Sequence, residues 1–204
     1  MFGFTIPELI MFTIVIVISL VIHEFSHGLV SYLQGDNTAK DHGRLTLNPI
    51  SHIDPFGLIA IYIIHFGWAK PIPINPSNYK NRRLGIILTS LAGPMSNILL
   101  AFLGAVIGLK LNPQSEIIIY FFKNFIEINV ILAIFNIIPI PPLDGSKIFA
   151  ELFGGIIREF IYKINQIGMI IVFLILYIPS VNNIFFSIKV IVYNEIIKIA
   201  SLIV

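Results

Sequence analysis

Residues 7–34 read PELIMFTIVIVISLVIHEFSHGLVSYLQ, and this apolar stretch carries two histidines and a glutamate near its middle. It starts with Pro7 and is followed by Gly35, the residue types that favour the first turn and the end of a helix. About 20 apolar residues are enough to cross a bilayer as a helix. Ionisable side chains in such a segment are costly and indicate a functional site by default. We therefore predict a membrane helix from Pro7 to Gln34, with a functional centre inside it.

His23 and His27 stand one helical turn apart in this segment. With about 3.6 residues per turn, they lie only about 40° apart around the helix. Both imidazoles can therefore reach one metal ion at roughly 2.0–2.1 Å. Glu24 lies about 100° round from His23, close enough to touch a water on that ion without being a ligand. This is the His-Glu-x-x-His pattern of zinc peptidases. The alternative is a histidine pair bonded to neighbouring helices in a channel or transporter, which leaves Glu24 between them unexplained.

The composition predicts an integral membrane protein in contact with the lipid bilayer. Hydrophobic residues make up 56% of the 204 residues and charged residues 12%, and the mean hydropathy is +0.91. A water-soluble domain of this size could not bury so much apolar surface. The absence of cysteine excludes disulfides, thiolate zinc sites and cysteine nucleophiles. The net charge of +2 is small, and no nucleic-acid partner is expected.

The hydrophobic pattern predicts an all-α polytopic membrane protein with about five transmembrane helices. The first segment is expected to be a retained helix rather than a cleaved signal peptide, because it has no basic leader and no small-residue cleavage site. A shorter apolar run, Phe56–Trp68, contains His65 and Gly67 and suits a re-entrant or interfacial segment that continues into an extended loop. We expect one transmembrane domain over 1–204, with a catalytic core at about 7–150 and scaffold helices at about 160–204. The further predicted spans are Leu84–Leu109, Ile117–Ile138, Phe160–Ile178 and Ile184–Val204.

Basic residues predict the orientation in the cell membrane. The segment before the first span has none, whereas six follow that span before the next one. The positive-inside rule then places this loop in the cytoplasm and the N-terminus outside. The metal centre is expected within the membrane, nearer the cytoplasmic face. The six residues are Lys40, Arg44, Lys70, Lys80, Arg82 and Arg83.

A third metal ligand is expected, because catalytic zinc usually takes three protein ligands and leaves one position open. The best candidate is Asp144, which follows a run containing Pro139, Pro141 and Pro142. These prolines remove backbone donors and prevent a continuing helix. Non-helical backbone at membrane depth occurs only where it lines a cavity. The alternative is that Asp144 merely caps a helix beginning near Ser146, and the two roles are compatible.

Other polar residues are weaker candidates. Asn97 and Asn136 lie on predicted spans, and their amides either donate to an oxyanion or substrate backbone, or hydrogen-bond to other helices. Asn129 belongs to no motif, and a structural role is expected for it. Weaker candidates for the third ligand are the carboxylates of Asp36, Asp41, Asp54, Glu151 and Glu159, whereas His42, His52 and His65 are expected to be loop or interfacial histidines.

Taken together, these motifs resemble the site-2 protease family of zinc intramembrane metalloproteases, in particular its small prokaryotic-type members. The resemblance covers about residues 20–145 and implies that His23, His27 and Asp144 hold one Zn²⁺ per chain, with Glu24 as the catalytic residue. Neither a PDZ nor a CBS domain is expected. The matching stretches are the His-Glu-x-x-His segment, GPMSN at 93–97, NIIPIPPLDG at 136–145 and the loop FGWAKPIPINP at 66–76.

The expected function is hydrolysis of peptide bonds within or next to transmembrane segments of membrane proteins, in regulated intramembrane proteolysis. A helical substrate must unwind before attack, and the extended stretch Pro71–Ile74 either pairs with the unwound chain as a strand edge or is an ordinary rigid loop. Two other functions remain open, a metal-binding transporter and a catalytically inactive homologue that binds membrane segments. A transporter needs a polar path out of the far side, which the last two predicted spans do not offer.

Overall fold

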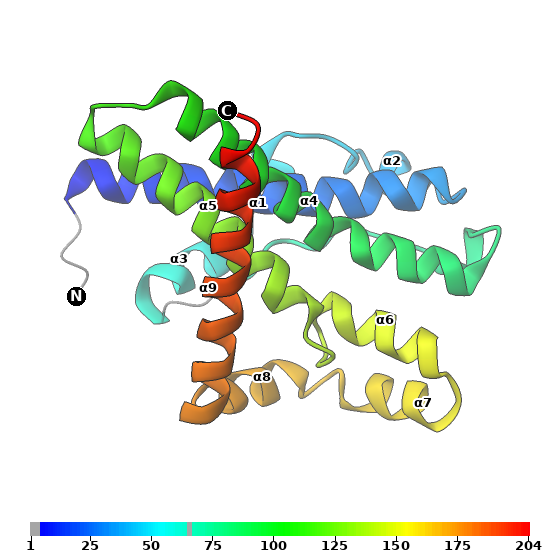
Figure 1. Cartoon of the computed structure of the whole chain (residues 1–204). Coiled ribbons are helices and arrows are strands. Elements are labelled where there is room, and N and C mark those ends of the chain that lie inside the picture. The colour runs from blue at the N-terminus through cyan, green and yellow to red at the C-terminus, as the bar shows by residue number, and fades with distance from the viewer. Residues whose placement is uncertain (1–4, 65–66) are drawn as a thin grey trace. The chain divides into compact units, whose positions relative to one another are not determined.

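The computed structural model describes residues 5–64 and 67–204 and divides into two compact units, residues 1–96 and 97–204. Figure 1 traces the helices along the chain from blue to red. All named elements in the described part of the chain are helical, which confirms the predicted all-α class. His65 and Phe66, which belong to the predicted interfacial segment and loop, lie outside the described residues.

The first unit opens with α1 (Ile6–Leu33), which agrees with the predicted span to within one residue at each end. Thr5 accepts a hydrogen bond from the backbone N–H of Glu8, and the Glu8 carboxylate accepts one from the N–H of Thr5 at 2.8 Å. This reciprocal cap fixes the start of the helix. After the helix, Gly35 adopts a φ of +106°, a backbone conformation that residues with a Cβ rarely adopt. The 28 residues of α1 are long and apolar enough to cross a membrane.

Short helices and extended chain connect α1 to α4 (Arg82–Leu111). Residues 70–75 belong to no helix or strand, and the preceding Ala69 forms an isolated antiparallel bridge with Ile53. With about 1.5 Å of rise per residue, α3 is far shorter than a bilayer core. The predicted short apolar segment therefore contains a helix too short to span the bilayer, and the interfacial placement of this segment stays a prediction. The short helices are α2 (Thr38–Asp41), η1 (Pro49–Ser51), α3 (Pro55–Ile64) and η2 (Pro76–Asn78).

Asp36 holds this connection against the end of α1. Its carboxylate is fully buried and accepts hydrogen bonds from Ser31 Oγ at 2.9 Å and from the Asn75 N–H at 2.8 Å. It also accepts bonds from Thr38 and from Asn78 Nδ2, the latter at 2.7 Å. Burial alone raises the pKa of Asp36, but these hydrogen bonds outweigh it and lower the pKa from 3.8 to about 2. The carboxylate is therefore charged at neutral pH and joins three segments of the first unit.

Small residues let the helices of the second unit pack closely. A Cβ added at Gly104 of α4 would lie 2.7 Å from the ring of Phe125 on α5 (Glu116–Ile137). Such close packing is typical of membrane helices, where small side chains allow backbones to approach. Lys189 of α9 (Pro179–Ser201) forms an ion pair with Glu127 of α5 at 2.6 Å. The buried core of this unit contains Ala101, Ala105, Ile126, Val130, Ile196 and Ala200.

The predicted fourth span, Phe160–Ile178, is wrong as a single helix. In the structure α7 (Gly155–Ile164) ends before a turn, and α8 (Gly168–Leu176) follows as a separate helix of nine residues. Such a length covers about 14 Å, half of a bilayer core. The turn brings Gly168 against the chain at Pro141, because a Cβ at Gly168 would lie 2.2 Å from the Pro141 carbonyl oxygen. Hydropathy alone did not reveal this close backbone approach.

About five spans were predicted, and the described part of the chain contains fewer helices of sufficient length and hydropathy. Within residues 5–64 and 67–204, three helices are long and apolar enough to cross a membrane, namely α1, α4 and α5. The predicted fifth span corresponds to α9, a continuous helix of 23 residues that is not among these three. It contains Lys189, Glu195 and Lys198, which lower its mean hydropathy.

The buried Asp36 carboxylate predicts a loss of stability in acid. Its pKa of about 2 is below the unfolded value of 3.8, so its contribution is complete above about pH 4 and disappears as the pH falls toward 2. At neutral pH this contribution is about 2 kcal/mol. We expect the thermal unfolding midpoint of the detergent-solubilised protein to fall between pH 5 and pH 3. In Asp36→Asn it should start lower and change less over that range. Asp41→Asn, at an exposed position in the same connection, is the control and should follow the wild-type curve. An Asp36→Asn curve with the wild-type slope would contradict this assignment.

Candidate metal centre

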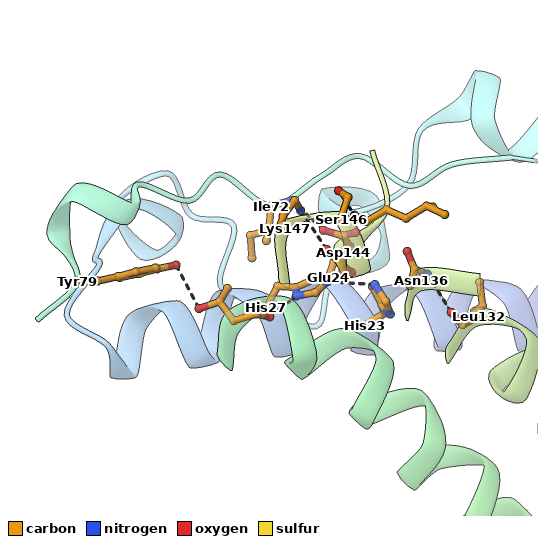
Figure 2. Close-up of polar contacts among 12 residues, drawn as sticks. His23, Glu24, His27, Ile72, Tyr79, Leu132, Asn136, Asp144, Ser146 and Lys147 are labelled. Atoms are coloured by element: carbon orange, nitrogen blue, oxygen red, sulfur yellow. Dashed lines mark hydrogen bonds and ion pairs between the residues drawn. The ribbon is translucent and has the colours of Figure 1, made fainter. Parts of the chain in front are cut away.

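The imidazoles of His23 and His27 converge on the buried side of α1. Both residues are nearly inaccessible, and their Nε2 atoms lie 3.0 Å apart (Figure 2). Nδ1 of His27 lies 2.6 Å from the carbonyl oxygen of Thr89 on α4, so this nitrogen must donate its proton to that oxygen. A neutral His27 therefore presents the lone pair of Nε2 toward His23. This outer hydrogen bond fixes the ring orientation, as is usual for metal-ligating histidines.

This nitrogen pair fits a zinc ion. Two ligands about 2.05 Å from a tetrahedral ion lie about 3.3 Å from one another. The observed 3.0 Å separation needs only a small side-chain movement to reach that value. The opposing surface is Gly93 of α4, where an added Cβ would lie 2.4 Å from Nε2 of His27 and 2.6 Å from Nε2 of His23. Gly93 therefore leaves free the space in front of both nitrogens. The groups against which Gly93 packs are therefore the two imidazoles.

A chain of hydrogen bonds connects His27 to Asp36. The Thr89 hydroxyl lies 3.1 Å from the Tyr79 hydroxyl, which lies 2.9 Å from Ser31 Oγ. Ser31 Oγ in turn donates to Asp36 at 2.9 Å. All of these side chains are buried. Sequence reasoning did not find Tyr79 or Thr89, because neither lies in a recognisable motif and they meet Ser31 and His27 only through the fold.

The Glu24 side chain contacts the loop that follows α3. Its Oε2 accepts a hydrogen bond of 2.8 Å from the backbone N–H of Ile72, as Figure 2 shows. The side chain is partly buried, and it neighbours His23 in sequence. The first unit thus brings together three of the predicted site residues, His23, Glu24 and His27, and adds a backbone donor that was not predicted.

Asp144 belongs to the second unit and is the first residue of α6 (Asp144–Phe153). The N-cap of α6 is Leu143, so Asp144 does not cap a helix that begins near Ser146, and this alternative is wrong. Lys147 forms an ion pair with the Asp144 carboxylate at 3.0 Å. A Cβ at Gly145 would lie 2.0 Å from the carbonyl oxygen of Ile137, so the chain folds back tightly onto the end of α5. The predicted break after α5 is confirmed, since no α-helix includes residues 138–143.

The asparagines make hydrogen bonds within the second unit. Asn97 Nδ2 donates to Asn129 Oδ1 at 2.8 Å, and Asn129 Nδ2 donates to the Phe125 carbonyl at 2.8 Å. Both side chains are fully buried, which favours the interhelical role for Asn97 and the structural role for Asn129. Asn136 Nδ2 donates to the carbonyl of Leu132 in its own helix at 3.0 Å. The oxyanion role of Asn97 and Asn136 stays a prediction.

Most of the weaker ligand candidates have other partners. Asp54 accepts bonds from the N–H groups of Phe56 and Gly57 at the start of α3, and Glu151 pairs with Arg158 at 2.9 Å. His52 is fully buried and bonds the Thr46 carbonyl at 2.6 Å through Nε2. Asp36 is the hydrogen-bonded centre described above. These contacts give Asp54, Glu151 and His52 partners within their own parts of the chain.

Comparisons with known proteins place the chain in a protein family. A model of peptidase family M50 matches residues 109–179. "Putative zinc metalloprotease YwhC" of Bacillus subtilis is 40% identical over 178 residues, which cover 83% of this chain and 81% of that protein. "Putative zinc metalloprotease Rip2" of Mycolicibacterium smegmatis is 28% identical over 83% of this chain and 67% of its own length. "Putative zinc metalloprotease MJ0611" of Methanocaldococcus jannaschii is 43% identical over 60 residues, 29% of this chain and 30% of that protein.

No solved structure matches the chain. The similarity to YwhC extends over most of both proteins, and the matched family consists of peptidases. With three long apolar helices and a paired-histidine centre, the chain is a membrane zinc metalloprotease. It belongs to the site-2 protease family, peptidase family M50.

Proposed function

We propose that this protease is an intramembrane enzyme that hydrolyses peptide bonds within or next to transmembrane segments of membrane proteins, in regulated intramembrane proteolysis. The observation that supports it most strongly is the position of His23, Glu24 and His27 inside α1, a helix long and apolar enough to cross the bilayer. A nucleophile generated there meets the chains that also lie in the membrane. Transmembrane segments are therefore the natural substrate class.

We propose further that His23, His27 and Asp144 hold one zinc ion per chain. The two histidines supply the converging nitrogen pair, and a third ligand of oxygen type gives the set that catalytic zinc commonly takes, with one position left open. Asp144 suits this role because it follows the proline-rich break that the family resemblance identifies as a ligand-bearing motif. Its ion pair with Lys147 orients the carboxylate. The absence of cysteine leaves only nitrogen and oxygen donors in the chain for such an ion.

Glu24 is proposed as the general base. When bound, zinc acidifies water and polarises the scissile carbonyl. Glu24 takes the proton of the attacking water and then gives it to the nitrogen of the departing amine, so that the peptide bond breaks and both fragments leave neutral at the cut. The hydrogen bond from Ile72 leaves Oε1 of Glu24 free for this proton. Asn97 and Asn136 are weaker candidates, proposed as hydrogen-bond donors to the substrate or to its oxyanion.

The orientation proposed for this enzyme follows from its basic residues. The connection between α1 and α4 contains Lys40, Arg44, Lys70 and Lys80, whereas residues 1–5 contain no lysine or arginine. The positive-inside rule places this connection in the cytoplasm and the N-terminus outside. His27 lies seven positions from Gln34 and is therefore nearer the cytoplasmic end of α1. The protein is proposed to act as one domain in the cell membrane.

An inactive homologue and a transporter are less well supported. An inactive homologue would be expected to lack Glu24 or a ligand, yet all four residues of the set are present. A transporter needs polar groups that lead through the membrane. The lining of the cavity between α5, α8 and α9 is entirely apolar and includes Ile134, Val172, Ile175, Ile184 and Ile188.

Substitution of Glu24 tests the proposed chemistry. Glu24→Gln removes the base but keeps the side-chain volume, and general acid–base catalysis contributes about 10²- to 10⁴-fold. We expect unchanged zinc content and at least a 100-fold loss in the cleavage of a reconstituted transmembrane test substrate. Glu8→Gln, which keeps the helix cap on the same helix, is the matched control and should cleave like the wild type. Cleavage by Glu24→Gln at the wild-type rate would remove Glu24 from the mechanism.

Substitution of Gly93 tests the geometry of the metal centre. In Gly93→Ala the new methyl group would occupy the space within 2.6 Å of both imidazole nitrogens. We expect the variant to fold, with an unchanged helical circular dichroism spectrum, but to lose most of its zinc and at least 90% of its activity. Gly108→Ala is the control in the same helix, because its Cβ would approach only Phe122, at 3.1 Å. Full zinc content in Gly93→Ala would show that the ion does not lie in front of these nitrogens.

A further inference from the structure

The backbone of Ile72 makes a contact with Glu24 that the mechanism does not require in its simplest form. The Ile72 N–H donates to Glu24 Oε2 at 2.8 Å. Pro71 and Pro73 flank it and have no N–H group, so Ile72 carries the only backbone donor of this tripeptide. That donor is directed at the carboxylate. A substrate strand that paired along Pro71–Ile74 would therefore have to compete with Glu24 for it.

The side chain of Ile72 fixes the position of this donor. Ile72 is only 6% exposed, and its Cδ1 lies 2.3 Å from the place that a Cβ on residue 28 would occupy. Residue 28 is glycine and stands one helical turn after Glu24 on α1. The missing side chain of Gly28 thus makes room for Ile72 directly beside the carboxylate that it contacts. Two contacts of Ile72 therefore hold the loop beside Glu24. One is the hydrogen bond from its backbone N–H, and the other is the packing of its side chain on α1.

The loop is also held on both sides of Ile72. Arg44 Nη2 donates to the carbonyl oxygens of Lys70 at 3.0 Å and Pro71 at 3.1 Å. Beyond Ile72, the Asn75 N–H donates to the buried Asp36 carboxylate at 2.8 Å. The extended segment therefore does not depend on Glu24 for its place. The loop, held by these other contacts, orients the flexible Glu24 side chain through the Ile72 N–H.

We propose that Ile72 is a positioning residue of the protease, whose backbone N–H holds one oxygen of Glu24 so that the other faces the attacking water. This inference rests on the proposed function and adds a role for the loop at residues 66–76. Holding a catalytic side chain in its reactive geometry accelerates the chemical step, and small misplacements reduce the rate strongly. A hydrogen bond to a charged group contributes about 1.5–3 kcal/mol, or roughly 10- to 100-fold in rate.

The first experiment removes the donor. Ile72→Pro deletes the N–H and keeps an apolar side chain, and Ile74→Pro makes the same change two positions away. With zinc-loaded protein and a transmembrane test substrate in proteoliposomes, we expect Ile72→Pro to lower kcat by roughly 10- to 100-fold. KM should stay within about twofold, because the contact is to the enzyme's own base. Ile74→Pro should leave kcat near the wild-type value. Strand-edge pairing predicts instead that both variants raise KM without lowering kcat, and that result would overturn the proposal.

The second experiment keeps every backbone donor and remains informative if Ile72→Pro fails to fold or to bind zinc. Gly28→Ala pushes Cδ1 of Ile72 away and should lower kcat without raising KM. The double variant Gly28→Ala/Ile72→Val lacks that Cδ1 atom, so the loop can return and most of kcat should recover. A double variant no better than Gly28→Ala would overturn the proposal, as would a wild-type kcat in zinc-loaded Ile72→Pro.

The Glu24→Gln variant distinguishes a failure of the proposed function of Glu24 from a failure of the proposed role of Ile72. If Glu24→Gln still cleaves, the proposed function of Glu24 fails and the inference fails with it. If Glu24→Gln is inactive while Ile72→Pro and Gly28→Ala keep the wild-type kcat, the proposed function stands and only the role of Ile72 is lost.

Discussion

Two imidazoles and a carboxylate inside an apolar helix need hydrogen-bond partners, and other segments of the first unit supply them. An unpartnered polar group away from water is costly, and a charged one costs more. His27 donates to the Thr89 carbonyl, and Glu24 accepts from the Ile72 N–H. Neither partner is a charged side chain. In these two hydrogen bonds the partner is a backbone group, whose position is set by the fold.

This requirement explains why the connection between α1 and α4 is ordered in detail. Asp36 fastens the loop at Asn75 and, through Ser31 and Tyr79, reaches the threonine that orients His27. The same connection delivers the Ile72 N–H to Glu24. The buried Asp36 carboxylate thus stabilises the surroundings of both His27 and Glu24. Hydrogen bonds within the first unit therefore connect His27, Glu24 and the loop to one another.

The sequence predicted the features that depend on local pattern. The limits of α1 followed from apolar length, Pro7 and Gly35, and the pairing of His23 with His27 followed from helical periodicity. The break before Asp144 followed from its prolines. The interruption between α7 and α8 did not, because it depends on the contact of Gly168 with the Pro141 backbone, 27 positions earlier. The bonds of Ile72 to Glu24 and of Thr89 to His27 likewise join residues 48 and 62 positions apart. Local hydropathy and motif spacing carry no information on such contacts.

The central claim is that His23, His27 and Asp144 together hold one zinc ion. Zinc-edge X-ray absorption on the purified, detergent-solubilised protein, with its zinc content measured on the same sample, tests this claim directly. The account predicts about one zinc per chain, coordinated only by nitrogen and oxygen at roughly 2.0–2.2 Å with the scattering pattern of two imidazoles. In Asp144→Asn the zinc content should fall sharply or the ion should lose its carboxylate ligand, whereas Glu159→Gln, at an exposed carboxylate of the second unit, should keep the wild-type spectrum. A wild-type protein without zinc, or an Asp144→Asn protein with full zinc and an unchanged spectrum, would contradict the account.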